Sequence, residues 1–343
     1  MKSKNLKKIK FIAISVICTV FLMSTTVSCC TLAKKAVDSI IVEKDTVSTE
    51  TYPPEESTTS KTVASSSQTN NESSSTNSTI SDDALTSEQV KSEFQDFTNG
   101  DPDYFDIFGF IDKNIASADT SLADEIIDYA LTYSKNNLEI FTDNYADSDI
   151  QEKLWDDYGG ETDLYILKTA SDAEISDLAT ETLDRRYKII SVEGFIMPLM
   201  DYKSYQSYSN YLSNQMNDYI KIMAAESEKP SVMDMGMTIS LEEYVLRIIS
   251  LYKFKDTYPD FKRISEIKNM LSGKLWVYLG GIDNTPVFDF DGNIIQERLD
   301  DFKANEIKYE GTEFGLKLKE YLDLLSDENF VRTQAVMDYL DSL

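Results

Sequence analysis

The stretch SLEEYVLRIISLYKF, residues 240–254, decides the fold class of this chain. Ser240 stands at a helix N-cap position and Glu243 follows three residues later, which is the spacing of a capping box. The apolar residues behind this start recur every three or four positions and share one helical face: Leu241, Tyr244, Val245, Ile248 and Tyr252. A helix with one apolar face buries that face against other elements. The stretch therefore predicts an amphipathic helix in a helical core.

The same periodicity recurs across residues 86–343, which contain 12 glycines and only five prolines. Helix starts are predicted at Ser121 with Asp124, at Ser171 with Glu174, and at Thr257-Tyr258-Pro259, the last helix ending at Gly280-Gly281. Further helices are predicted over 312–325 and 327–342, and one helix is predicted for the tyrosine-rich stretch 202–219.

One stretch has a different character. PVFDFDGNIIQ, residues 286–296, has two short apolar runs around Asp291-Gly292, a strong hairpin signal. The prediction is an all-α fold: a bundle-like single domain of many helices with at most one small β-hairpin, over residues 86–343.

The residue types that are missing exclude several chemistries. There is no histidine, which removes Ser-His-Asp catalysis and histidine-ligated zinc. The three cysteines are Cys18, Cys29 and Cys30, so the predicted domain has neither a disulfide nor a thiolate nucleophile. No cofactor is expected.

The charge balance is strongly acidic, with a formal net charge of −27. From Cys29 onward, 28 bases face 60 acids, which leaves −32. Such a chain repels nucleic acid and anionic lipid and favours cationic partners. The alternative interpretation is that the acidic excess serves solubility alone.

The N-terminus has the order of a secretory signal. Five lysines in residues 1–10 precede a 13-residue apolar run, 11–23, and then the small polar residues STTVS. The junction TTVSC resembles the lipobox of bacterial lipoproteins, with Val27 and Ser28 in the two positions before Cys29 and Thr26 where leucine is usual.

The resemblance covers about 30 residues and implies cleavage after a signal peptide, 1–28, with a lipid on Cys29, or on Cys30 in the alternative frame. Two or three acyl chains suffice for stable membrane attachment. The alternative is an uncleaved anchor helix, and both interpretations place the domain outside the cytoplasm.

A linker follows the lipidation site. From Asp45 to Ser81, 20 of 37 residues are serine or threonine, which predicts a disordered tether within 29–85. A flexible coil of this length has an r.m.s. reach of about 40 Å. The tether would therefore hold the domain away from the membrane.

Three candidate sites stand out in the domain. Asp289 and Asp291 lie in an oxygen-rich run that suits calcium, but Val287 and Arg298 occupy the EF-hand positions that need ligands. A plain turn is therefore favoured there, and no metal is predicted.

Tyr202 and Tyr211 fall on opposite flanks of a helical stripe, where they suit sugar stacking or peptide binding. The stripe itself is predicted to be core: Tyr205, Tyr208, Leu212, Met216, Tyr219 and Met223.

Glu193 lies in an apolar run and is a candidate general acid. The competing interpretation pairs it with Arg185 or Arg186, or places it at the edge of a cleft.

These features favour a lipid-anchored extracellular binding protein of the bacterial envelope, with a protein, peptide or glycan as partner and no nucleic acid. A carboxylate-dependent enzyme acting on cell-wall or other glycans is the first alternative, and a transporter-associated solute receptor is the second.

Replacing Cys29 with alanine, or Cys30 with alanine in the alternative frame, is expected to abolish incorporation of a palmitate analogue and either release the protein from membrane lipid or block its maturation. The reason is that the lipid on this cysteine is the predicted anchor. Metabolic labelling of cells followed by membrane fractionation checks this. A wild-type chain that takes up no label would leave the uncleaved helix as the anchor.

Overall fold

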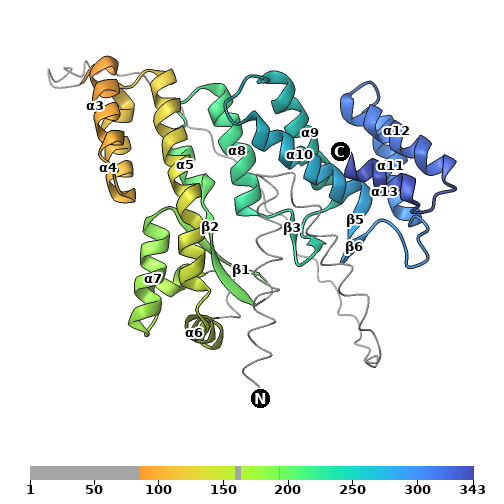
Figure 1. The fold of residues 1–343 in the computed structure, drawn as a ribbon, viewed down its shortest axis with the longest axis horizontal. Coiled ribbons are helices and arrows are strands. Elements are labelled where there is room, and N and C mark those ends of the chain that lie inside the picture. Colours follow the sequence, from red (N-terminus) through yellow and green to blue (C-terminus); the bar gives the residue numbers. More distant parts are fainter. Residues whose placement is uncertain (1–84, 159–163, 193) are drawn as a thin grey trace, which may run out of the picture. The chain divides into compact units, whose positions relative to one another are not determined.

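In the computed structural model, the described residues are 85–158, 164–192 and 194–343, and most of them are helical (Figure 1). The α-helices are α3 (Ser87–Asn99), α4 (Tyr104–Asn114), α5 (Thr120–Tyr145), α6 (Ser148–Tyr158), α7 (Ala173–Asp184), α8 (Asn214–Glu228), α9 (Leu241–Thr257), α10 (Ile264–Gly280), α11 (Gln296–Lys308), α12 (Glu313–Asp327) and α13 (Gln334–Asp341). The 3₁₀ helices are η2 (Ile115–Ser117), η3 (Leu164–Thr169) and η4 (Tyr202–Tyr208). The all-α prediction is confirmed. None of these helices has the length and apolarity needed to cross a membrane.

The observed helix starts show which caps the local sequence predicts correctly. Ser240 caps α9 as predicted, its Oγ accepting the backbone N–H of Glu243 at 3.1 Å. The starts predicted at Ser121 and Ser171 are wrong by one or two residues, because Asp119 and Asp172 cap α5 and α7. An aspartate carboxylate caps a helix as well as a serine does, so the nearby aspartates compete for the position.

The predicted helix start at Thr257-Tyr258-Pro259 is wrong. Residues 258–263 form consecutive turns that bury Phe261, and α10 begins at Ile264. Its end at Gly280 is as predicted, since Gly281 takes the positive φ of 80° that favours glycine.

The strands differ from the single hairpin predicted at 286–296. The structure has three antiparallel pairs: β1 (Tyr187–Val192) with β2 (Phe195–Met200), β3 (Val232–Met233) with β4 (Gly236–Met237), and β5 (Gly281–Ile282) with β6 (Thr285–Pro286). At 286–296 the turn is present, but isolated bridges take the place of a hairpin: Phe288 pairs with Ile294, and Asn293 pairs with Val331.

The longest pair, β1–β2, comes from the apolar run around Glu193. Isoleucine and valine suit strands, and Gly194 takes the positive φ of 73° that closes the turn. The register pairs Ile189 with Pro198. The side chain of Gln151, on α6, binds the free edge of β2: its Nε2 donates to the carbonyl of Ile196 at 2.7 Å and its Oε1 accepts the N–H of Ile196 at 3.1 Å.

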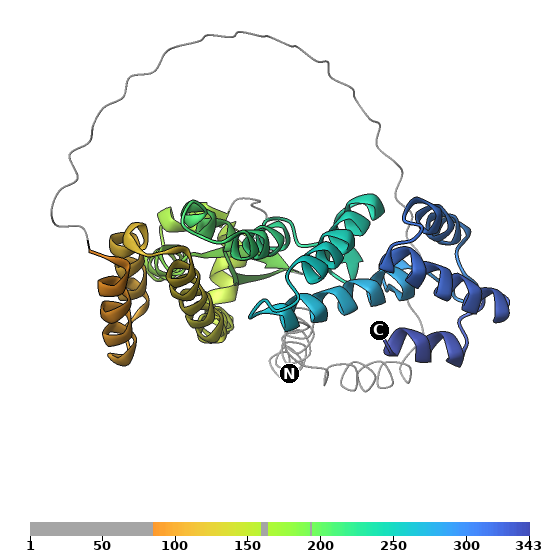
Figure 2. The same cartoon turned by 90° about the horizontal axis from the view of Figure 1, so that it is seen from above.

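The buried apolar residues form two clusters. The larger extends from Val90 on α3 to Leu340 on α13, and the smaller joins α6, η3 and α7 to Ile189 and Ile196 of the β1–β2 pair. Neighbouring helices pack as α9 on α10, α11 on α12 and α10 on α13 (Figure 1). Seen from above, the C-terminal helices α11, α12 and α13, coloured blue, lie together (Figure 2).

Tyrosine is the main aromatic residue of the larger cluster. The stripe from Tyr205 to Met223 is buried as predicted, although it is built from η4 and α8 rather than one helix. Burial raises the pKa of Tyr205 to about 12, although its hydrogen bond with Ser134 acts in the opposite direction. In the smaller cluster, burial likewise raises the pKa of Tyr145 to about 12.

We expect the full chain to unfold cooperatively in alkali. A phenol whose pKa is raised by folding stabilises the native state below its ordinary pKa of 10.0 and loses that contribution as pH rises through about 12. Far-ultraviolet circular dichroism should therefore lose its helical signal over this interval, together with a rise in tyrosinate absorbance. Complete tyrosine ionisation near pH 10 with intact helix signal would contradict the buried placement.

Candidate functional site

Among the described residues, the candidates singled out in the sequence do not come together as one site. Glu193 lies outside the described residues. Of its suggested partners, Arg185 binds Glu181 at 2.9 Å, and Arg186 donates to the hydroxyl of Tyr208 at 2.7 Å. Both arginines therefore have other partners.

Tyr202 and Tyr211 do not flank a common groove. Tyr202 is buried, with its ring edge-on to that of Tyr219, so it is core rather than a ligand-facing flank. Tyr211 is partly exposed beyond η4. The helical-wheel prediction for this pair failed because η4 has a different period from an α-helix.

Asp289 organises a turn. Its Oδ1 accepts the backbone N–H groups of Asp291 at 3.0 Å and Asn293 at 2.8 Å, and Gly292 has a φ of 84°. Within the described ranges, no three acids come together as a metal site. The local bonds give Asp289 a turn-forming role that needs no ligand.

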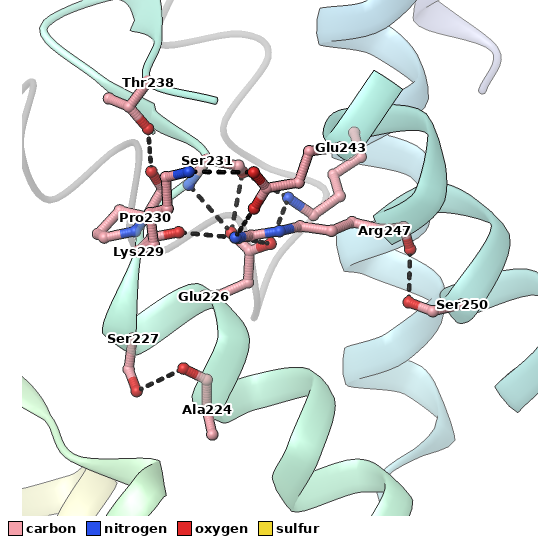
Figure 3. A network of polar contacts seen from close by, with 11 residues as sticks. Ala224, Glu226, Ser227, Lys229, Pro230, Ser231, Thr238, Glu243, Arg247 and Ser250 are labelled. Atoms are coloured by element: carbon pink, nitrogen blue, oxygen red, sulfur yellow. Dashed lines mark hydrogen bonds and ion pairs between the residues drawn. The ribbon is translucent and has the colours of Figure 1, made fainter. Parts of the chain in front are cut away.

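A partly buried ionic cluster, which sequence analysis missed, joins α8, α9 and α10 (Figure 3). Lys274 of α10 reaches Glu226 of α8 at 2.9 Å and donates to the Oγ of Ser231 at 2.6 Å. Arg247 of α9 binds the same Glu226 at 2.8 Å and also binds Glu243 at 2.7 Å. We call these five residues the Lys274 cluster.

The charges of the Lys274 cluster are mutually stabilised. Burial alone would raise the pKa of Glu226, but Lys274 and Arg247 act against it and lower the pKa overall. Burial also lowers the pKa of Lys274, and Glu226 opposes that shift. An ionised Glu226 with an ammonium and a guanidinium on either side is the arrangement that a buried charge requires.

The contact between Ser231 and Lys274 resembles the geometry of a serine nucleophile beside a lysine base. Such a base must be neutral and must take the hydroxyl proton. Here the Ser231 hydroxyl donates to Glu226 at 2.8 Å, and the same carboxylate favours the charged form of Lys274. Because Ser231 is also buried, the contact supports a structural role.

A second buried cluster joins α5 to the start of α10. Arg263 contacts Asp128 at 2.5 Å and Glu266 at 3.0 Å, and Lys135 reaches Glu266 at 2.9 Å. Tyr219 donates to Glu266 at 2.6 Å. Burial opposes ionisation of Glu266, yet Lys135 and Tyr219 lower its pKa, so this carboxylate is ionised and unsuited to donate a proton.

A pocket of about 230 Å³ opens between α9 and α11. Its lining comprises Glu242, Val245, Asp301, Ala304, Asn305 and Lys308. Side-chain contacts hold both helices in place. Arg247 of α9 binds Glu226 of α8, and Tyr278 of α10 donates to Asp301 of α11 at 2.6 Å. The pocket is thus a small, open concave surface of mixed polarity between two fixed helices.

Comparison of the chain with known protein families, curated proteins and solved structures gives no match. The chemistry of the residues therefore carries the functional argument.

Replacing Glu226 with glutamine is expected to lower the free energy of unfolding by about 3–5 kcal/mol, because it leaves Lys274 buried without a counter-charge. The matched control is Glu243→Gln, which removes the more exposed acid bound to the same Arg247 and should cost far less than the loss of Glu226. Urea denaturation of the full chain measures both.

Adding Lys274→Met to Glu226→Gln should recover part of the loss, since it removes the unpaired charge. If the Glu226 and Glu243 substitutions lowered the free energy of unfolding equally, the burial of Glu226 and Lys274 would not contribute to stability.

Proposed function

We propose that this chain is a lipid-anchored binding protein on the outer face of the bacterial cytoplasmic membrane, and that its helical domain binds a basic envelope protein or peptide. The anchor is the lipid on Cys29, with Cys30 as the alternative. The Ser/Thr-rich segment is the spacer that lets the domain reach its partner.

One observation supports the partner class above all: the net charge resides in the domain. Residues 1–84 contain nine acids and nine bases, so the whole charge of −27 belongs to residues 85–343, with 51 acids and 24 bases. An acidic domain attracts basic partners over distances near the screening length of about 10 Å and repels nucleic acid.

Internal ion pairing leaves this excess available. The ion pairs among the described residues use sixteen bases and fifteen acids. These pairs thus engage two thirds of the 24 bases of the domain but only fifteen of its 51 acids.

A zero-length carbodiimide, which couples carboxylates to amines, tests the proposal on intact cells that express the tagged full chain. We expect mass spectrometry of the cross-linked products to identify a basic partner. Capture should fail at about 1 M salt, where the screening length falls to about 3 Å. Capture of acidic proteins, or capture indifferent to salt, would contradict the proposed function.

A further inference from the structure

Two carboxylates face one pocket from different helices. Glu242 of α9 and Asp301 of α11 both line the cavity of about 230 Å³. No lysine or arginine of the described ranges lies within ion-pair distance of either acid. Asp301 accepts hydrogen bonds from neutral groups only, the hydroxyl of Tyr278 at 2.6 Å and the amide of Asn305 at 3.1 Å. Among the described residues, the pocket therefore presents two carboxylates without a direct ion pair, although the buried guanidinium of Arg298 acts electrostatically on Asp301.

The rest of the lining suits a long aliphatic side chain with a charged end. Val245 and Ala304 supply apolar wall, one from each helix. A lysine side chain places its methylene groups on apolar surface and its ammonium among oxygen atoms. The hydrogen bonds from Tyr278 and Asn305 hold the Asp301 carboxylate in place before a ligand arrives, which lowers the entropic cost of binding.

Two cations lie near the pocket and affect which ligand it can bind. Lys308 also lines it, and its ammonium lies 5.4 Å from the centre of the Tyr309 ring. Arg298 is buried on the inner side of α11, where it donates to the carbonyl of Tyr278 at 2.6 Å and is absent from the lining. Among the described residues, Lys308 is thus the one cation in the lining, against two acids.

We propose that the pocket between α9 and α11 receives a lysine side chain of the basic partner, with Glu242 and Asp301 binding its ammonium group. This inference rests on the proposed function, because it names the point at which the acidic domain takes hold of its ligand. It adds a specific site to what would otherwise be a diffuse attraction between opposite charges.

The test uses a lysine pentapeptide as probe and calorimetric titration of the full chain in detergent. Glu242→Gln is expected to weaken binding about tenfold, as is Ala304→Met, which fills the pocket without changing charge. Lys308→Met should strengthen binding by removing the competing cation. Asp301→Asn tests the second acid of the pocket. The Glu242 and Ala304 variants are the main test, because both residues are exposed and their variants should fold normally.

The matched control is the double variant Glu93→Gln/Asp96→Asn on α3, which removes two exposed acids that form no ion pair with the described bases. Its binding should change less than twofold. If the control weakens the probe as much as Glu242→Gln, or if Ala304→Met has no effect, the pocket assignment fails while the proposed function stands. If the wild-type chain does not bind the probe at all, the proposed function fails as well.

Discussion

The pairing of Lys274 with Glu226 is the contact on which the central helices depend. A lysine ammonium and a glutamate carboxylate inside a helical core cost several kcal/mol each to desolvate, and they persist because each supplies the other's counter-charge. Arg247 adds α9 to the pair, and Arg263 binds Asp128 of α5 at the opposite end of α10. Helix α10 is thus fixed by buried charge near its start and in its second half. Apolar packing alone would tolerate small rotations, whereas these charges have one favourable arrangement.

The same contacts shape the surface. A chain with few bases that commits many of them to internal pairs leaves its outer face dominated by acids. The interior therefore helps to determine what the exterior can bind. The pocket between α9 and α11 illustrates this, because Arg247 binds Glu226 of α8 and forms no ion pair with Glu242, five residues before it on α9.

The sequence predicted the helical class because helical periodicity and caps are local signals. Ser240 capping α9 and Gly281 ending α10 depend on neighbours a few residues away, so they could be read directly. The β1–β2 pair was missed because its apolar run fits a buried helix or strand equally well. The tyrosine stripe was read correctly as core, but Tyr202 was not, because η4 interrupts the assumed α-helix.

The candidate site could not be predicted in the same way. Arg263 and Asp128 lie 135 residues apart, and with 60 acids in the chain no carboxylate stands out by sequence alone. The pocket combines Glu242 and Asp301 only because α9 and α11 are brought together by the fold. One feature of the sequence could have indicated the buried ion pairs. A lysine or arginine on the apolar face of a predicted helix is buried when the helix packs, so it needs an acidic partner.

The side chain of Gln151 covers a strand edge through which neighbouring molecules could otherwise associate. A two-stranded sheet leaves backbone groups unpaired along its outer edges, and such an edge can recruit a strand from another molecule. On β2, Gln151 occupies both backbone groups of Ile196, and Pro198, two residues on and facing the same side, has no N–H to offer. Molecules tethered side by side on a membrane, as proposed for this protein, meet at high local concentration. A blunted edge keeps them separate, so each domain remains open to its partner rather than to its neighbours.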